Sequence, residues 1–208
     1  MSSSLGSIFR IHTFGESHGP AVGVVIDGCP PRLPITSEEI QSDLDRRRPG
    51  QSSLVTQRDE KDTIEILSGW KDGLTLGTPL ALLVRNQDHI SGAYDHLKDV
   101  YRPSHADFTT DQKYGIRAHE GGGRSSARET IGRVAAGAVA RKLLSISAGV
   151  QVLAWVHQIH DISGSYEINN VTLDDVESSP TRCPDPGAAT KMTKAIEKAR
   201  KDGDSLGG

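Results

Sequence analysis

The stretch GGGRSSARET at residues 121–130 gathers the residue types best suited to chemistry. Its glycines let the backbone approach a ligand closely and adopt positive φ angles that other residues resist. Ser126 and Glu129 have the spacing of a capping box, which predicts that a helix begins here. Unpaired N–H groups at a helix N-terminus, with Arg124, Arg128 and two serine hydroxyls beside them, favour a site for phosphate or another anion. The simpler alternative is a glycine-rich turn before an ordinary capped helix.

Two of the eight histidines stand in settings that favour a functional role. His18 lies in a glycine-flanked turn before an apolar stretch, and loops of this kind commonly carry function. His105 lies in the sequence RPSHAD, held by a proline and flanked by an arginine and a carboxylate. An imidazole beside a bound phosphate is favoured in its protonated form and can donate a proton to a leaving oxygen. For any single histidine, a surface or core role is the commoner interpretation.

The sequence predicts no metal site. His157 and His160 fall in a segment expected to be a strand, where a three-residue step places side chains on opposite faces. HExxH and CxxC patterns are absent, and Cys29 and Cys183 lie far apart beside prolines. Reduced thiols in a cytosol-like compartment are therefore expected.

Arg46, Arg47 and Arg48 close an expected helix, and their clustering has three interpretations. They can complement the negative end of the helix dipole, or bind phosphate and carboxylate groups through the planar guanidinium fork. They can also contact nucleic acid, which would show a steep salt dependence. Only 4% aromatic residues and a net charge of −3 argue against nucleic acid. Anion recognition must therefore come from local arginine clusters.

The composition is typical of a soluble globular protein, with 35% hydrophobic and 25% charged residues among 208. No run of residues approaches the roughly 18 apolar residues that a membrane span needs. The first residues, MSSS, lack a hydrophobic signal core and the arginines of a transit peptide. We therefore expect a cytoplasmic protein that does not contact a membrane, or a plastid protein if a transit peptide has been removed.

Periodicity and turn signals predict an α+β chain. Strands are expected on either side of the turn at 15–20, and at 64–67, 80–84 and 150–159. Helices are expected from the cap Thr36 to about Arg46, after Ser126, and at 188–201 with Gly203 as the C-terminal cap. Residues 86–119 are polar and irregular, and a segment of this length is usually functional or mobile.

Four stretches together resemble the chorismate synthase family. They are GESHGPAVGVVIDGCPP (15–31), DLDRRRPGQS (43–52), RPSHAD (102–107) and GGGRSSARETIGRVAAGA (121–138). Their order matches the family, and the resemblance covers essentially the whole chain but only the N-terminal part of the family's usual length. It implies a β-α-β sandwich of the chorismate synthase type, with residues 1–208 as a single domain that is incomplete at the C-terminus.

The resemblance implies a carbon–oxygen lyase of the shikimate pathway. Members of the family eliminate phosphate from 5-enolpyruvylshikimate-3-phosphate to give chorismate, the precursor of the aromatic amino acids. They require reduced FMN, and NADPH where flavin reduction is intrinsic, and they assemble as homotetramers. The protein supplies position and charge while the cofactor carries the chemistry.

The resemblance also assigns roles to residues. His18 matches the histidine that protonates the departing phosphate, and His105 the histidine that protonates or stabilises the reduced flavin. Arg124, Ser125 and Ser126 match the FMN-contacting stretch. The candidates for phosphate groups of substrate or NADPH are Arg47 and Arg128.

This chain departs from the family at two points. Ser53 stands where the family usually has a second phosphate-binding arginine, a loss on the order of 1.5–3 kcal/mol of binding. The catalytic aspartate and further flavin contacts of the family lie beyond residue 208. The alternative function is therefore an inactive, phosphate- or flavin-binding fragment of the enzyme.

Overall fold

The structure is a computed structural model that describes residues 3–52, 54, 60–87 and 96–208. Ser53, where the family usually has an arginine, lies outside the described residues. The chain divides into two compact units, residues 1–48 with 59–150, and residues 49–58 with 151–208. The single domain expected from the sequence stays a prediction. In the described part of the chain no helix is both long and apolar enough to cross a membrane.

The first unit is built on a five-stranded antiparallel sheet. Its strands, in spatial order, are β1 (Ser4–Leu5), β2 (Arg10–Gly15), β3 (Ala21–Asp27), β7 (Leu80–Arg85) and β4 (Ile64–Ser68). The strands predicted around the turn at 15–20 and at 64–67 and 80–84 are thereby confirmed. Alternate residues of β3 and β7 are fully buried and face the core, as period-two side-chain alternation requires.

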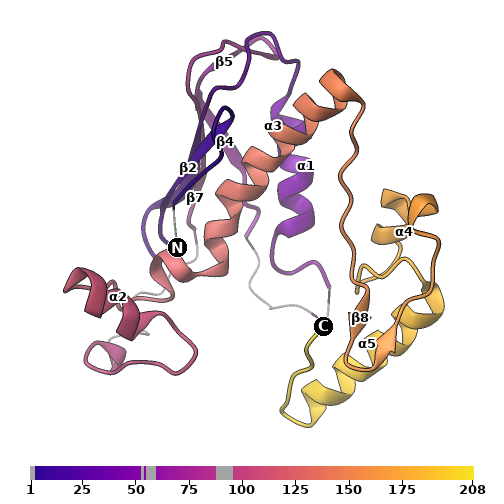
Figure 1. Cartoon of the computed structure of the whole chain (residues 1–208). Helices are drawn as coiled ribbons and strands as arrows, with labels where there is room; N and C mark the ends of the chain where they lie inside the picture. Colours follow the sequence, from indigo (N-terminus) through magenta and orange to yellow (C-terminus); the bar gives the residue numbers. More distant parts are fainter. Residues whose placement is uncertain (1–2, 53, 55–59, 88–95) are drawn as a thin grey trace. The chain divides into compact units, whose positions relative to one another are not determined.

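Two helices, α1 (Ser37–Arg47) and α3 (Thr130–Ala148), lie side by side against the sheet (Figure 1). The predicted start of α1 is confirmed, because Thr36 and Glu39 form a complete capping box. Helix α3 approaches β3 closely at Gly132, where an added Cβ would lie 2.7 Å from the carbonyl oxygen of Gly23. The N-terminal end of α3 is thereby held at the end of the sheet that carries the turn at 15–20.

Helix α2 (Asp107–Tyr114) lies inside the segment predicted to be irregular, so that prediction is wrong there. Asp107 begins the helix with a favourable negative charge, and Gly115 ends it with a left-handed φ of 71°. Both signals are present in the sequence. This unit also contains a short hairpin, β5 (Trp70–Lys71) with β6 (Leu74–Thr75), and the 3₁₀ helices η2 (Gly123–Ser125) and η3 (Ala127–Glu129).

The second unit contains β8 (Gln158–Ile159), β9 (Ile162–Ser163), η4 (Ile168–Asn170), α4 (Leu173–Glu177) and α5 (Pro186–Lys201). The strand predicted at 150–159 is wrong, because only its last two residues pair, with β9. The predicted last helix is confirmed, with Asp185 accepting hydrogen bonds from two backbone N–H groups at its start and Gly203 at a φ of 73° after its end. The architecture is α+β, as the sequence predicts.

Candidate functional site

A cavity of about 590 Å³ lies in the first unit, at the entrance to α3. Its wall combines hydroxyls, backbone N–H groups, an imidazole and charged side chains. The residues that line it are Glu16, Thr110, Arg117, Ala118, and residues 104–107 and 122–127. A cavity of this size can hold a cofactor or a drug-sized ligand.

The triple-glycine bend forms one wall of this cavity. Gly121 and Gly123 adopt left-handed φ angles of 62° and 50°, which favour glycine. The amide of Ser125 donates to Gly122 O at 2.9 Å, so the chain enters η2 directly after the bend. A Cβ on Gly122 would lie 3.1 Å from the Cα of Ser126, a crowded contact that a larger residue makes only if Ser126 shifts.

The helix start differs from the predicted capping box. The Ser126 hydroxyl accepts a hydrogen bond from the backbone N–H of Arg128 at 3.3 Å, and so caps the 3₁₀ helix η3. The Glu129 carboxylate does not return to this cap; it accepts from the Thr13 hydroxyl and pairs with Arg124. The predicted box is therefore wrong, because Thr13 on strand β2 and Arg124 on η2 bind the Glu129 carboxylate instead.

His18 packs against the first glycine of the bend. A Cβ added to Gly121 would lie 2.1 Å from the ring Nδ1 of His18, closer than any real contact. The Ser17 hydroxyl lies 3.0 Å from the same nitrogen. The structure therefore places the His18 ring at the triple-glycine bend.

His105 lines the cavity from the loop before α2. Its Nδ1 lies 3.0 Å from the carbonyl oxygen of Pro103, and a carbonyl oxygen can only accept, so Nδ1 carries the proton. In the neutral ring, Nε2 is then the nitrogen that can accept a proton. The preceding Ser104 has a left-handed φ of 60°, a conformation uncommon for residues other than glycine.

Arg124 is bound to the sheet rather than extended into solvent. Its guanidinium donates to Gly15 O at 2.7 Å, to Thr13 O at 3.0 Å and to the Glu129 carboxylate at 3.0 Å. These contacts fix η2 against the end of β2. The arginine thus shapes the cavity wall while its charge is balanced by Glu129.

Arg47 and Arg128 belong to a buried charge cluster that does not line the cavity. Arg128 is 5% exposed and lies 2.7 Å from Glu60 Oε2 and 3.0 Å from Asp62 Oδ1. Arg47 donates to the other oxygen of Asp62 at 2.8 Å. Burial lowers the pKa of Arg47 and the charge of Asp62 opposes that shift. The two arginines and two carboxylates balance one another.

Sequence reasoning missed several of these groups. Glu60 and Asp62 stand in a polar stretch without periodicity, and only the fold brings them to Arg128. Asn86, which accepts from Arg128 Nε, follows the last residue of β7. The position of Asn86 directly after an apolar strand was the one sequence feature that could have pointed to it.

Among the described residues no group of three or more His, Cys, Asp or Glu side chains could hold a metal ion.

Comparisons with known proteins agree on one family. A family profile described as chorismate synthase matches residues 9–208. The chain is 57% identical to the chorismate synthase of Prochlorococcus marinus (strain AS9601) and 61% identical to that of Synechococcus elongatus, in each case over all of its 208 residues. It is 60% identical to the Akkermansia muciniphila enzyme over 209 aligned positions. The chain spans 57–58% of the length of these curated relatives.

A solved crystal structure of chorismate synthase has the same fold. It superposes with a TM-score of 0.70 and 32% sequence identity, covering 97% of this chain and 56% of the other. The likeness confirms the fold type that the four motifs predicted. By its sequence over nearly all 208 residues and by its fold, this chain belongs to the chorismate synthase family.

Proposed function

We propose that this chain contributes the first part of a chorismate synthase active site, which eliminates phosphate from 5-enolpyruvylshikimate-3-phosphate and forms chorismate. The observation that carries the proposal is that His105 and residues 124–126 line one cavity, while His18 packs on Gly121 next to the residues that line it. Acid–base groups and anion-binding donors thereby lie along the same glycine-rich bend and its cavity. An elimination that releases phosphate needs both.

The cavity fits reduced FMN by the chemistry of its donors. Ser125 and Ser126, at the junction of η2 and η3, line the cavity, and their hydroxyls are donors suited to a phosphate group. Arg124 would act there by holding these turns on the sheet as well as by its charge. When bound, reduced FMN supplies electron density to the substrate and recovers it with the hydrogen, without net redox change.

The two histidines are proposed to move protons. His18 protonates the departing phosphate, and its packing on Gly121 keeps the ring at the bend. His105 protonates or stabilises the reduced flavin. Because Nδ1 of His105 is held by Pro103 O, the other ring nitrogen is the one that gains or gives the proton.

Arg47 and Arg128 are proposed to bind phosphate groups of the substrate, or of NADPH where flavin reduction is intrinsic. Asp62 lies on both guanidinium groups, so a bound anion must compete with this carboxylate. The family resemblance further supports assembly as a homotetramer in the cytoplasm, with no nucleic acid or membrane partner.

The second candidate is an inactive flavin- or phosphate-binding fragment. It is favoured by the 57–58% of the relatives' length that the chain spans. In this candidate, the 208 residues bind FMN but do not turn over.

A chimera tests the proposed function, and the unfused chain tests the fragment candidate. The 208 residues are fused to the remaining C-terminal part of the Synechococcus elongatus relative, and compared with the unfused chain. Both are assayed anaerobically with photoreduced FMN and 5-enolpyruvylshikimate-3-phosphate, following chorismate and phosphate release. We expect turnover by the chimera, its loss in His18→Ala with FMN affinity retained, and none by the chain alone.

Each outcome has a distinct meaning. A chimera that folds and binds FMN but does not turn over contradicts the proposed function. Turnover by the unfused chain at the level of the chimera contradicts the fragment candidate.

A further inference from the structure

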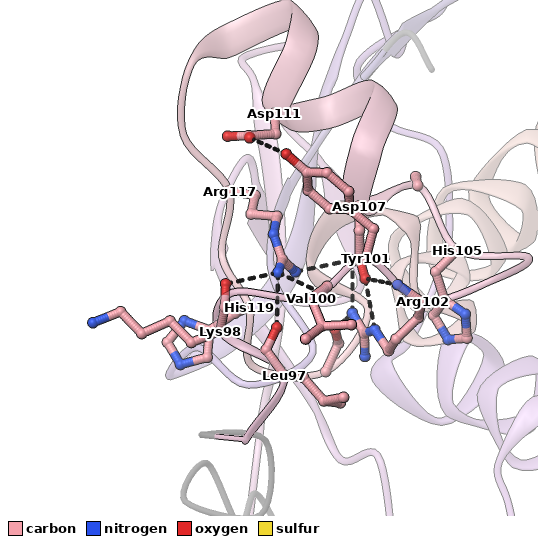
Figure 2. Close-up of polar contacts among 12 residues, drawn as sticks. Leu97, Lys98, Val100, Tyr101, Arg102, His105, Asp107, Asp111, Arg117 and His119 are labelled. Carbon is pink, nitrogen blue, oxygen red and sulfur yellow. Dashed lines mark hydrogen bonds and ion pairs between the residues drawn. The ribbon is translucent and has the colours of Figure 1, made fainter.

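The loop that carries His105 is closed by an arginine–aspartate pair. Arg102 donates to Asp107 through Nε and Nη2, each at 2.8 Å, and through its backbone N–H at 3.0 Å. Figure 2 shows this bidentate pair with His105 on the loop between its two members. Because the carboxylate is 7% exposed, water competes little for it. The loop therefore has a fixed start and a fixed end.

A second arginine holds the same carboxylate from another segment. Arg117 Nη1 lies 3.4 Å from Asp107 Oδ1, and its Nη2 lies 2.8 Å from each of three carbonyl oxygens. These oxygens belong to Leu97, Lys98 and Val100, just before the loop (Figure 2). The Asp107 carboxylate at the start of α2 therefore contacts both Arg102, before the loop, and Arg117, after the helix.

Arg102 also reaches the triple-glycine bend. Its Nη2, which bonds Asp107, donates to the carbonyl oxygen of Gly121 at 2.7 Å. Gly121 is the residue against which the His18 ring packs. One guanidinium therefore connects the His105 loop to the peptide that supports His18.

We propose that Asp107 is a positioning residue that, through Arg102, fixes the His105 loop and the Gly121 support of His18 relative to each other. The inference rests on the proposed function for its catalytic meaning, since the two histidines are the proton carriers of that proposal. Asp107 acts through Arg102 rather than on the substrate. Its charge is needed because both of its oxygens accept from cationic N–H groups at the same time.

The first test uses the 208-residue chain and the ring signals of its histidines in ¹H–¹³C NMR spectra. In Asp107→Asn, an NH₂ group replaces one acceptor and faces the donors of Arg102. We expect the His18 and His105 signals to shift or to split, and those of His12 and His157 to stay in place. His12 lies on β2 and His157 in the second unit, so they report whether each unit remains folded.

Asp111→Asn is the matched control. Asp111 lies one turn further along α2 and accepts a hydrogen bond from the Tyr101 hydroxyl at 2.6 Å; Figure 2 draws no bond between Asp111 and Arg102. Its substitution removes the same charge from the same helix. Asp111→Asn should leave the His18 signals unshifted. Equal shifts in both variants would show that loss of a negative charge alone moves the signals, and would overturn the proposal.

The second test uses the chimera. A misplacement of about 1 Å can cost roughly 100-fold in rate, so we expect Asp107→Asn to lower kcat by about 10- to 100-fold, with a smaller change in KM. Asp107→Glu keeps a carboxylate that can accept both nitrogens of Arg102 and should recover part of this loss. An equal fall in both variants, or an unchanged kcat in Asp107→Asn, would overturn the proposal.

The outcomes separate the two proposals. A wild-type chimera without turnover contradicts the proposed function, and the NMR comparison still decides on positioning. If Asp107→Asn does not fold, Arg102→Lys takes its place, because an ammonium cannot make the bidentate pair and reach Gly121 O together. Unchanged His18 and His105 signals in that variant would contradict positioning.

Discussion

Gly121 is the residue on which the local geometry of the candidate site depends most. Its φ of 62° is left-handed, and a Cβ would collide with the His18 ring at 2.1 Å. The two constraints are separable, because Gly115 has a similar φ of 71° with no neighbouring atom within 4 Å of its added Cβ. The cost of a left-handed φ and the cost of displacing the His18 ring can therefore be measured separately.

We expect Gly121→Ala to be more destabilising than Gly115→Ala. A left-handed angle costs an L-residue roughly 1–2 kcal/mol at either position. Only Gly121→Ala must also displace His18, so its loss in unfolding free energy is larger, and in the chimera it alone lowers turnover. Urea denaturation of both variants measures the difference. Equal losses of unfolding free energy in the two variants would show that the His18 ring can move aside without an energetic cost.

Asp107 makes a pH-dependent contribution to stability. Hydrogen bonds from Arg102 hold the pKa of this carboxyl well below its ordinary value. A group with a lowered folded-state pKa stabilises the fold above its unfolded pKa, near about 3.9, and loses that contribution as the pH falls.

The difference in unfolding free energy between wild type and Asp107→Asn should therefore be constant from about pH 7 to about pH 5 and shrink below about pH 4. Urea denaturation over this range measures it, with Asp111→Asn as the control. A difference that grows on acidification would contradict the assigned direction of the pKa.

At the scale of elements, the close packing of α3 on β3 sets the position of the triple-glycine bend and of η2. Gly132 allows the approach, because its added Cβ would lie 2.7 Å from Gly23 O and 3.2 Å from the Thr13 side chain. Gly137 lies on the exposed side of the same helix, with no atom within 4 Å. The packing of α3 on β3 therefore requires a glycine at position 132 but not at position 137.

Gly132→Ala is expected to destabilise the first unit by about 1–3 kcal/mol, because overpacking moves the helix off the strand. Gly137→Ala is expected to stabilise it by about 1 kcal/mol, through helix propensity alone. Thermal unfolding followed by circular dichroism compares them. A loss of the same size in both would mean that close packing at Gly132 does not matter.

At the scale of the whole molecule, the two units differ in the size of their cores. The first buries apolar residues of the sheet, α1 and α3 in one cluster, with Trp70 packed against it. The buried cluster of the second consists of Cys183, Ala188, Ala189 and Met192. A small core stabilises a unit less, because less apolar surface leaves water on folding.

The two tryptophans report on the units separately, since Trp70 lies in the first and Trp155 in the second. In Trp70→Phe the remaining fluorescence should change at a lower urea concentration than in Trp155→Phe. Coincident transitions in the two variants would instead indicate one cooperative unit, and so support the single domain predicted from the sequence.

The sequence determined the family and most local elements. Thr36 and Glu39, three residues apart, are enough to start α1, and the apolar run at 21–26 is enough for a core strand. Such signals act between near neighbours, so they can be read from the chain. The helix α2 could have been found in the same way, from Asp107 and Gly115.

Only the tertiary structure decided the partners of the charged side chains. Arg124 bonds Gly15, 109 residues away, and Glu129 bonds Thr13, 116 residues away. The capping box expected at Ser126 does not form, because Glu129 bonds the distant Thr13 instead. Of the strand expected at 150–159, only residues 158–159 form a strand pair among the described residues. The physical reason is that a buried charge takes whichever opposite group the fold brings within reach, and that choice has no period or spacing in the sequence.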